Sequence, residues 1–97
     1  MSDTGPGWTA VRLHPRDNVV CLLRAHAAGE QPLVDGMEAP TLKGDVASGH
    51  KIALSEIAEG DTVFKYGHPI GRATRPIAPG EHVHLHNLIG LAAENDG

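Results

Sequence analysis

The chain has 97 residues, 40% of them hydrophobic and only 3% aromatic, and its formal net charge is −4 when the histidines are neutral. This length suffices for one domain with a modest core, and the shortage of aromatic side chains leaves little room for a large internal ligand cavity. The eight Lys and Arg residues are scattered, which argues against a nucleic-acid partner because such proteins usually show a basic stripe. The sequence shows neither a secretory signal nor the roughly 20-residue apolar run that spans a bilayer. We therefore expect a cytoplasmic protein without a membrane partner.

The first part of the chain is predicted to be a flexible leader followed by short extended segments. Residues 1–8 form the leader, and residues 9–13 are predicted to be a strand that stops at His14-Pro15. The reason for the stop is that the residue before a proline is held in extended or turn geometry. The apolar run at residues 19–23 is compatible with a buried strand or with one short helix, because five residues do not establish a period.

One phrase recurs along the chain: an apolar residue, Ala, any residue, Gly, two polar residues and an apolar residue. It occupies residues 46–52, 57–63 and 77–83, with a weaker version that starts at Ala27 and leads to Leu33. Each copy predicts a tight turn with the glycine at positive φ, followed by a strand whose first inward residue is apolar. The glycine spacings of 20, 11 and 20 residues are too irregular for a solenoid and favour a compact all-β unit.

The rest of the chain is also predicted to lack long regular elements. Residues 35–49 contain three glycines and one proline and are expected to be a long surface loop or an extended arm, and residues 91–97 are expected to be a flexible tail. No stretch shows a helical apolar stripe beyond about one turn. The sequence therefore predicts a small all-β domain over residues 9–90 with at most one short helix, and with further strands at residues 51–54, 62–66, 70–74 and 82–88.

Three of the seven histidines, His82, His84 and His86, lie within five residues. On a strand they would share one face, while Val83 and Leu85 would face a core. Neighbouring residues on one face are about 6.6 Å apart, so two adjacent imidazoles can reach one metal ion. His82 and His86 would be about 13 Å apart, too far to share an ion on a regular strand. The pattern predicts either a metal site with His84 as its common member or a solvated polar strand face.

Other residues are candidates for the remainder of such a site. Two arginines, Arg72 and Arg75, follow the glycine-bracketed turn at residues 67–71. The planar guanidinium suits a carboxylate, but the same segment is also compatible with a hairpin that carries ordinary surface arginines. Further metal ligands would come from a partner chain or from Glu81, His50 or His68.

Several short motifs together carry a family resemblance that none of them would carry alone. They are Gly49-His50-Lys51-Ile52-Ala53-Leu54, Lys65-Tyr66-Gly67, Ile70-Gly71-Arg72-Ala73 and the segments at residues 80–87 and 14–20. With these motifs the chain resembles the N-terminal SAF domain of the altronate/galactarate dehydratase family over roughly residues 9–90. It is also similar to the α subunit of (2R)-sulfolactate sulfo-lyase.

The resemblance implies a β-clip fold and the elimination of water, or of sulfite, from a small hydroxy acid such as altronate or galactarate. It also implies a divalent metal, with iron as the metal that the family favours and zinc or manganese as alternatives. The partner would be a large catalytic subunit that shares the site. By this resemblance the catalytic residues would be His84 and His86, the substrate-binding residues Lys51 and Arg72, and the metal ligands His82, His84 and His86.

Two other functions stay open at this point. One is a sugar-acid-binding module without catalysis. The other is a subunit that forms homo-oligomers through exposed strand edges.

Overall fold

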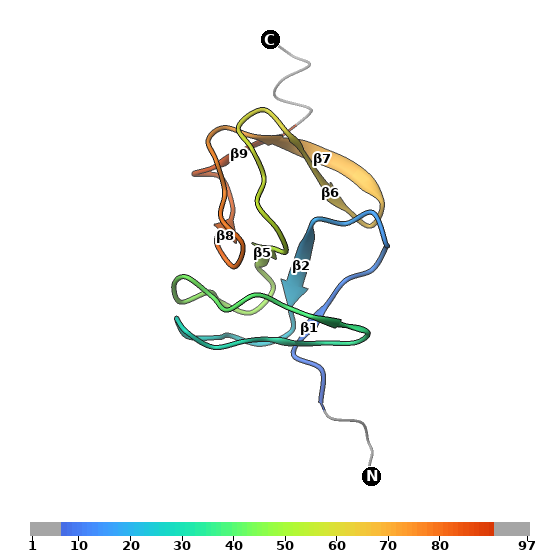
Figure 1. Cartoon of the computed structure of the whole chain (residues 1–97), viewed down its shortest axis with the longest axis vertical. Coiled ribbons are helices and arrows are strands. Elements are labelled where there is room, and N and C mark those ends of the chain that lie inside the picture. The colour runs from blue at the N-terminus through green and yellow to red at the C-terminus, as the bar shows by residue number, and fades with distance from the viewer. Residues whose placement is uncertain (1–6, 91–97) are drawn as a thin grey trace.

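The computed structural model describes residues 7–90 (Figure 1). The predicted leader at residues 1–8 lies outside the described residues except for its last two, and the predicted tail at residues 91–97 lies wholly outside them. Residues 7–90 contain no helix, and so none that could cross a bilayer, which confirms the predicted all-β class. The nine strands are β1 Ala10–Val11, β2 Val19–Leu22, β3 Leu33–Val34, β4 Met37–Glu38, β5 Lys51–Ala53, β6 Thr62–Lys65, β7 His68–Ala73, β8 His82–Val83 and β9 Leu88–Gly90.

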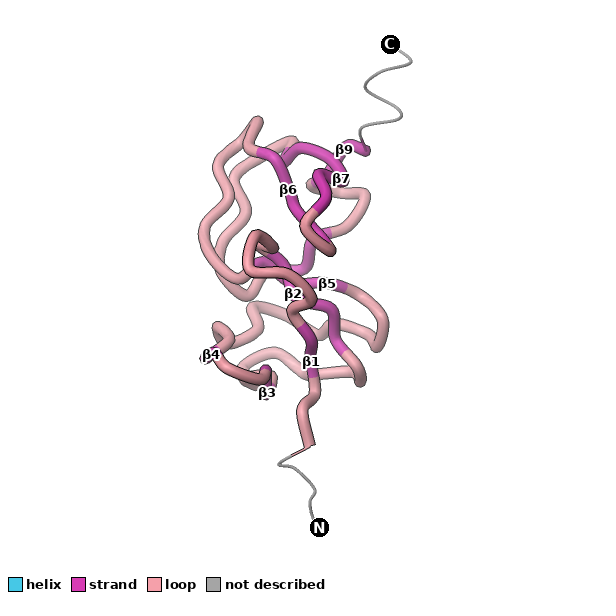
Figure 2. Tube along the Cα trace, turned by 90° about the vertical axis from the view of Figure 1, so that its right-hand side faces the viewer, coloured by secondary structure: helices cyan, strands magenta, loops and turns pink. Residues whose placement is uncertain are grey.

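The strands form two main antiparallel sheets and one small hairpin. A four-stranded sheet has the order β1-β2-β5-β8, a three-stranded sheet has the order β6-β7-β9, and β3 pairs with β4. Figure 1 shows β1 toward one end of the molecule, β6, β7 and β9 toward the other, and β2 and β5 between them. Figure 2 shows that loops and turns make up much of the remaining chain, as expected for a sequence punctuated by glycines.

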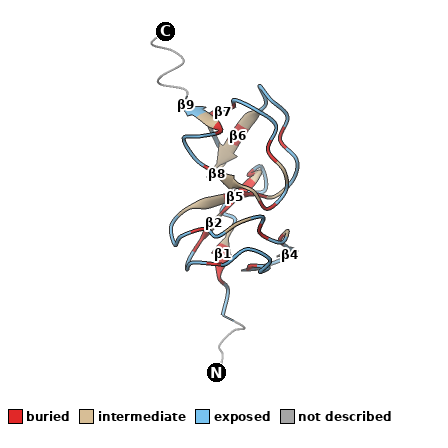
Figure 3. Ribbon diagram, turned by 90° about the vertical axis from the view of Figure 1, so that its left-hand side faces the viewer, coloured by how far each residue is buried: buried red, intermediate tan, exposed pale blue. Residues whose placement is uncertain are grey.

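The central strands β2 and β5 separate two apolar cores. Val20 and Ile52 are partners across these strands and lie in the first core, whereas Val19 and Ala53, also partners, lie in the second. Because successive strand residues point to opposite faces, one short ladder supplies both cores, whose buried residues are red in Figure 3. Residues 19–23 contain strand β2 and not the alternative helix. The apolar residues are continuous because a strand that is buried on both faces needs them at successive positions.

Four turns of one design connect these elements, as the repeated phrase predicts. In each turn the glycine has a φ between 83° and 88°, which only glycine adopts without strain. Each turn exchanges two backbone hydrogen bonds with one partner residue. The glycine N–H donates to the carbonyl of this partner, and the partner's N–H donates to the carbonyl of the residue that follows the glycine. Leu22 is the partner of the Gly49 turn at 2.8 Å, and Ala53 is the partner of the Gly80 turn at 2.9 Å. The apolar residues that end the three full phrases are completely buried, as predicted: Ile52, Val63 and Val83.

Two predictions for the first half of the chain are wrong. Leu33, the expected inward residue after the weak phrase, is 47% exposed, and Val34 is buried instead. Thr9 sets this register, because its N–H donates to the Leu33 carbonyl and its hydroxyl accepts the Leu33 N–H, both at 2.8 Å. Residues 35–49 are more than a surface loop, since they include β4 and contribute three side chains to the first core: Ala39, Leu42 and Val46.

A polar corner at Asp17 and Asn18 ties the β6–β7 hairpin to the four-stranded sheet. The Asn18 Oδ1 accepts the Phe64 N–H at 2.8 Å, and its Nδ2 donates to the Thr62 carbonyl at 3.0 Å. Asp17 is buried and accepts N–H groups from the tip of the same hairpin. These bonds join segments that are far apart in sequence, so they fix how the two sheets meet.

Candidate metal site

The chain reverses direction directly after Val83, and the predicted strand over residues 82–88 is therefore wrong. Strand β8 ends at Val83, residues 84–87 form a turn, and β9 begins at Leu88. Val83 is completely buried, as predicted, whereas Leu85 is 82% exposed. The alternation of apolar and polar residues thus describes only the first two residues of this segment.

Asn87 builds this turn. It is completely buried, its backbone N–H donates to the His84 carbonyl at 3.0 Å, and its Oδ1 accepts the His84 N–H at 2.9 Å. Its Nδ2 donates to the His82 carbonyl at 2.8 Å. A single side chain therefore replaces the ladder bonds that an extended continuation of β8 would need.

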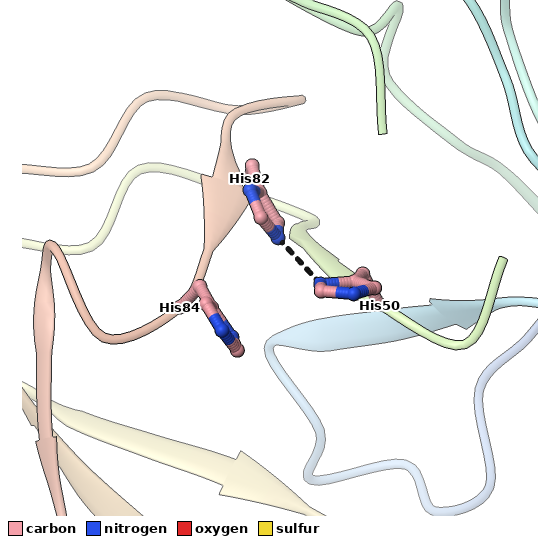
Figure 4. A group of neighbouring side chains, drawn as sticks. All are labelled: His50, His82 and His84. Carbon is pink, nitrogen blue, oxygen red and sulfur yellow. Dashed lines mark hydrogen bonds between the residues drawn. The ribbon is translucent and has the colours of Figure 1, made fainter. Parts of the chain in front are cut away.

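The turn gathers histidine rings from two distant parts of the chain. His82 comes from β8, His84 from the turn that follows it, and His50 from the turn that leads into β5 (Figure 4). The His50 Nδ1 and the His82 Nε2 are 3.0 Å apart, so one of them carries the proton of a hydrogen bond. Each of the three residues offers one ring nitrogen such that all three nitrogens lie within 4.8 Å of one another. Among residues 7–90, no other group of three His, Cys, Asp or Glu side chains brings its ligand atoms this close together.

His50 reaches this cluster because its turn departs from the pattern of the other three. In those three turns the residue after the glycine is a carboxylate, and it accepts the N–H of an alanine that begins the same turn. In the Gly49 turn that position is His50, whose ring faces His82 instead. The histidine-rich segment predicts His50 only as an additional ligand, although this break in the repeat is a signal that identifies it. The three carboxylates are Glu30, Asp61 and Glu81.

The other histidines and Glu81 differ in how close they come to this cluster. The His86 ring centroid lies 5.5 Å from that of His82. The Cα separation of about 13 Å predicted for these residues does not apply, because it assumed an extended strand and β8 ends at Val83. Glu81 accepts the Ala78 N–H and supports Asn87 at 3.4 Å, so its carboxylate is engaged in the turn. His68 begins β7, in the other sheet.

Burial and neighbouring positive charge shape the electrostatics of the site. Burial is the main cause that lowers the pKa of His82, and His50, His84, His86 and Lys51 add to this effect. The pKa of Lys51 is also lowered, first by burial and then by Lys65, while Cys21 opposes the shift. His82 is therefore neutral near pH 7, as a metal ligand must be.

Two cations accompany the histidines, and only one of them was predicted. Lys51 lies on β5 directly after His50, and its charge contributes to the lowered pKa of His82, which places it near the cluster. Lys65 ends β6 and acts electrostatically on Lys51, so it adds a second positive charge. Arg72 lies on β7 in the three-stranded sheet. Strand β7 does not pair with β5 or β8, the strands next to the clustered histidines.

A sizeable surface hollow lies elsewhere, and chemistry rather than size therefore locates the candidate site. This hollow of about 580 Å³ is lined by residues 24–27, Glu30 and residues 45–47, and none of the three clustered histidines is among them. It contains the buried His26, whose Nδ1 is 3.0 Å from the Glu30 carboxylate. The Nε2 of His26 is shielded from solvent, so this ring does not offer a ligand atom to the hollow.

Comparison with known proteins gives one family match and several relatives. The family model for the altronate/galactarate dehydratase SAF domain matches residues 8–90. Over 77 residues, or 79% of this chain, the sequence is 49% identical to an altronate dehydratase of Escherichia coli (strain K12) and 44% identical to an altronate dehydratase of Bacillus subtilis (strain 168). These matches span 15% of each of those proteins, so the chain corresponds to a small part of their length.

A second group of relatives is named as subunits. Over 47 residues, the chain is 47% identical to the (2R)-sulfolactate sulfo-lyase subunit alpha of Chromohalobacter salexigens. This match covers 48% of the chain and 50% of the relative. The same identity and length are found with the subunit alpha of Paracoccus pantotrophus, of which 70% is covered.

Proposed function

Because the chain belongs to the altronate/galactarate dehydratase SAF domain family, we propose that it is the small subunit of a hydroxy-acid dehydratase or related lyase. In this proposal it contributes a metal-assisted site that is shared with a large catalytic subunit. The observation that carries the proposal is the convergence of His50, His82 and His84. The relatives named as alpha subunits support a role as a separate subunit.

The donor set suits a divalent transition metal. Two nitrogen ligands at the usual zinc distance lie roughly 3.0–3.4 Å apart around one ion, and the closest nitrogens of His50 and His82 are 3.0 Å apart. Imidazole ligands suit iron and zinc better than manganese, which prefers oxygen. His50, His82 and His84 would hold the ion, which leaves coordination positions for substrate or for groups of the large subunit. When bound, the metal would stabilise negative charge on a substrate oxygen.

The chain's own residues supply two of the functions that an elimination needs, and the base that accepts the proton is assigned to the large subunit. Loss of a proton next to a carboxylate builds negative charge on the carboxylate oxygens, and a nearby cation stabilises this charge. Lys51 acts electrostatically on His82 and has Lys65 nearby, so we assign this role to Lys51. His86 borders the cluster and is exposed, so it is available to give a proton to the departing hydroxyl, which then leaves as water. Arg72 lies on β7, which pairs with β9 directly after the histidine turn, and it keeps its proposed role in binding the substrate.

Reconstitution with a large subunit tests the proposal. We expect the complex to dehydrate a sugar acid such as altronate or galactarate, and we expect His84→Ala to reduce its bound metal at least about tenfold. His68→Ala is the matched control, because His68 is an exposed histidine outside the cluster. Full activity of the large subunit alone, or equal metal content in both variants, would contradict the proposal.

A binding module without catalysis is the second candidate. It is favoured by the small share of the altronate dehydratases that the chain covers, 15%. In that case calorimetry would show sugar-acid binding by the isolated chain, and the binding would weaken in Lys51→Met. If the complex with the large subunit binds the acid but does not dehydrate it, the binding module is the correct function and the first proposal is wrong.

A further inference from the structure

Asn87 combines two properties that seldom occur together in a small domain. Its side chain is completely buried, and yet it lies one residue after His86, in a segment whose other side chains are mostly exposed. Burying an amide is unfavourable unless all its hydrogen bonds are made. The fold therefore has to satisfy Asn87 at this position.

Every polar atom of the Asn87 side chain has a partner, and each partner belongs to the histidine segment. Its Oδ1 accepts the His84 N–H, and its Nδ2 donates to the His82 carbonyl and more distantly to the Glu81 carboxylate at 3.4 Å. The side chain thus holds the backbone on both sides of Val83. It also fixes the backbone of two of the three clustered histidines.

The alternative backbone shows what this arrangement achieves. If residues 82–86 continued as a regular strand, the Cα atoms of His82 and His86 would be about 13 Å apart, and their rings would keep a similar separation because strand side chains stand roughly perpendicular to the sheet. In the folded chain their ring centroids are 5.5 Å apart, and those of His82 and His84 are 5.4 Å apart and stacked. The turn therefore converts a row of histidines into a cluster.

We propose that Asn87 is the positioning residue of the histidine site, and that its side-chain amide sets the affinity of the site for a divalent metal. This inference rests on the proposed function to the extent that the cluster binds metal. Asn87 has no ring or charge of its own to offer an ion. It acts through the backbone of His82 and His84, and a change in its amide is expected to weaken metal binding 10- to 100-fold, as is usual for groups that orient ligands.

Asn87→Asp is the sharpest substitution, because it keeps the shape and the Oδ1 acceptor while replacing the donor by an oxygen. This oxygen would face the His82 carbonyl and the Glu81 carboxylate, so the turn would be pushed open. Asn18→Asp is a matched control, since Asn18 also joins one N–H and one carbonyl of the backbone, those of Phe64 and Thr62. Both variants lose one amide donor, but only Asn87→Asp changes the histidine turn.

Calorimetric titration of the whole chain with zinc measures the expected difference in zinc affinity between the two variants. Asn87→Asp should lose 10- to 100-fold in zinc affinity, whereas Asn18→Asp should stay within about threefold of the unmodified chain. Unchanged zinc affinity in Asn87→Asp, or an equal loss in both variants, would overturn the role of Asn87 while leaving the metal site intact. Zinc binding that is absent from the unmodified chain, or unaffected by His84→Ala, would overturn the metal site itself and this inference with it.

Hydrogen exchange gives a second measurement that does not depend on a folded variant. In the unmodified chain the His84 amide should be protected to a degree similar to that of the Phe64 amide, because each donates to an asparagine Oδ1. Addition of zinc should raise the protection of His84 further and leave Phe64 unchanged. A His84 amide that exchanges as fast as an open turn would overturn the inference.

Discussion

The tip of the β6–β7 hairpin and the histidine turn after β8 are both held by a side-chain oxygen that accepts backbone N–H groups. The two reversals differ in how far along the chain this oxygen lies. At the hairpin tip, the Asp17 carboxylate accepts the N–H groups of Tyr66 at 3.0 Å and Gly67 at 2.8 Å, across 49 and 50 residues of sequence. In the histidine turn, Asn87 accepts the N–H of His84 across three residues. We call the contact made by Asp17 the remote latch and the contact made by Asn87 the local latch.

The difference assigns the two latches to different tasks. A remote latch joins parts of the fold that are far apart in sequence, so its loss should lower global stability. A local latch shapes a few residues and leaves the rest of the domain intact, so its loss should change the site more than the stability. The following predictions separate these two effects, from the largest to the smallest.

Asp17→Ala is expected to have the largest effect on stability. It leaves two backbone N–H groups without their acceptor, at about 1–3 kcal/mol for each group that stays buried, so we expect a loss of about 2–4 kcal/mol in the free energy of unfolding. Urea unfolding measures this loss, and Glu59→Ala, a change at an exposed carboxylate, is the control. Zinc affinity should stay unchanged. A loss below about 0.5 kcal/mol would show that the remote latch is dispensable.

Tyr66→Asn is expected to stabilise the same hairpin tip. Among residues 7–90, Tyr66 is the non-glycine residue with positive φ, at 59°, and the two-residue tip that it forms with Gly67 favours Asn-Gly. The left-handed conformation costs about 1–2 kcal/mol for most residues but less for asparagine. Loss of the Lys65 ammonium above the ring, now 5.1 Å from the centroid, offsets part of the gain. We expect a net gain of about 0.5–1 kcal/mol.

Tyr66→Phe is the control for this change, because it keeps the backbone strain and the aromatic ring. Thermal unfolding of the two variants measures the difference. A melting temperature of Tyr66→Asn below that of Tyr66→Phe would mean that the ring contributes more than the strain costs.

The fold was largely predictable wherever local residues determine the backbone. The glycine phrases predicted four turns, and the apolar residues that follow them predicted the buried positions Ile52, Val63 and Val83, which the structure confirms. Prediction failed where a distant partner decides. Thr9 sets the register of β3 from a different strand, and no pattern within residues 27–33 reports it.

The candidate site was predictable in composition but not in shape. The histidine-rich segment drew attention to His82, His84 and His86, yet the alternating pattern indicated a strand. The strand ends because one buried amide, that of Asn87, satisfies the backbone in a turn, and an asparagine in a polar segment gives no sign of being buried. His50 joins the cluster from 32 residues away, and only its place in the glycine repeat distinguishes it from a surface histidine.

The metal-free protein is expected to lose stability on mild acidification because of His82. Its pKa in the folded chain is lowered below the ordinary value of 6.5, so the unfolded chain binds the proton more readily. The contribution of His82 is therefore fully present above about pH 6.5 and is lost as the pH falls through the folded value. Since His82 is only partly buried, we expect an effect smaller than that of either substitution above.

Melting temperatures at about pH 7.5 and 5.5, in the presence of a chelator, measure this effect. His82→Gln should reduce the difference between the two values, because glutamine does not titrate. Glu30, whose carboxyl pKa is lowered from 4.5 mainly by the Ala27 N–H, loses its contribution only at lower pH and does not interfere. An equal pH dependence in His82→Gln would assign the acid sensitivity to other groups.

Leu85→Ala is expected to have the smallest effect on stability, and for that reason it separates the turn from the strand. A leucine on the buried face of a strand would lose about 2–5 kcal/mol on truncation, whereas a side chain that is 82% exposed should lose less than about 0.5 kcal/mol. Val83→Ala provides the contrast, because Val83 is completely buried two residues earlier. If urea unfolding gave similar losses for both variants, the histidine turn would have to be a strand in solution. If Leu85→Ala instead keeps full stability but weakens association with the large subunit, the exposed leucine between His84 and His86 lies at the shared site.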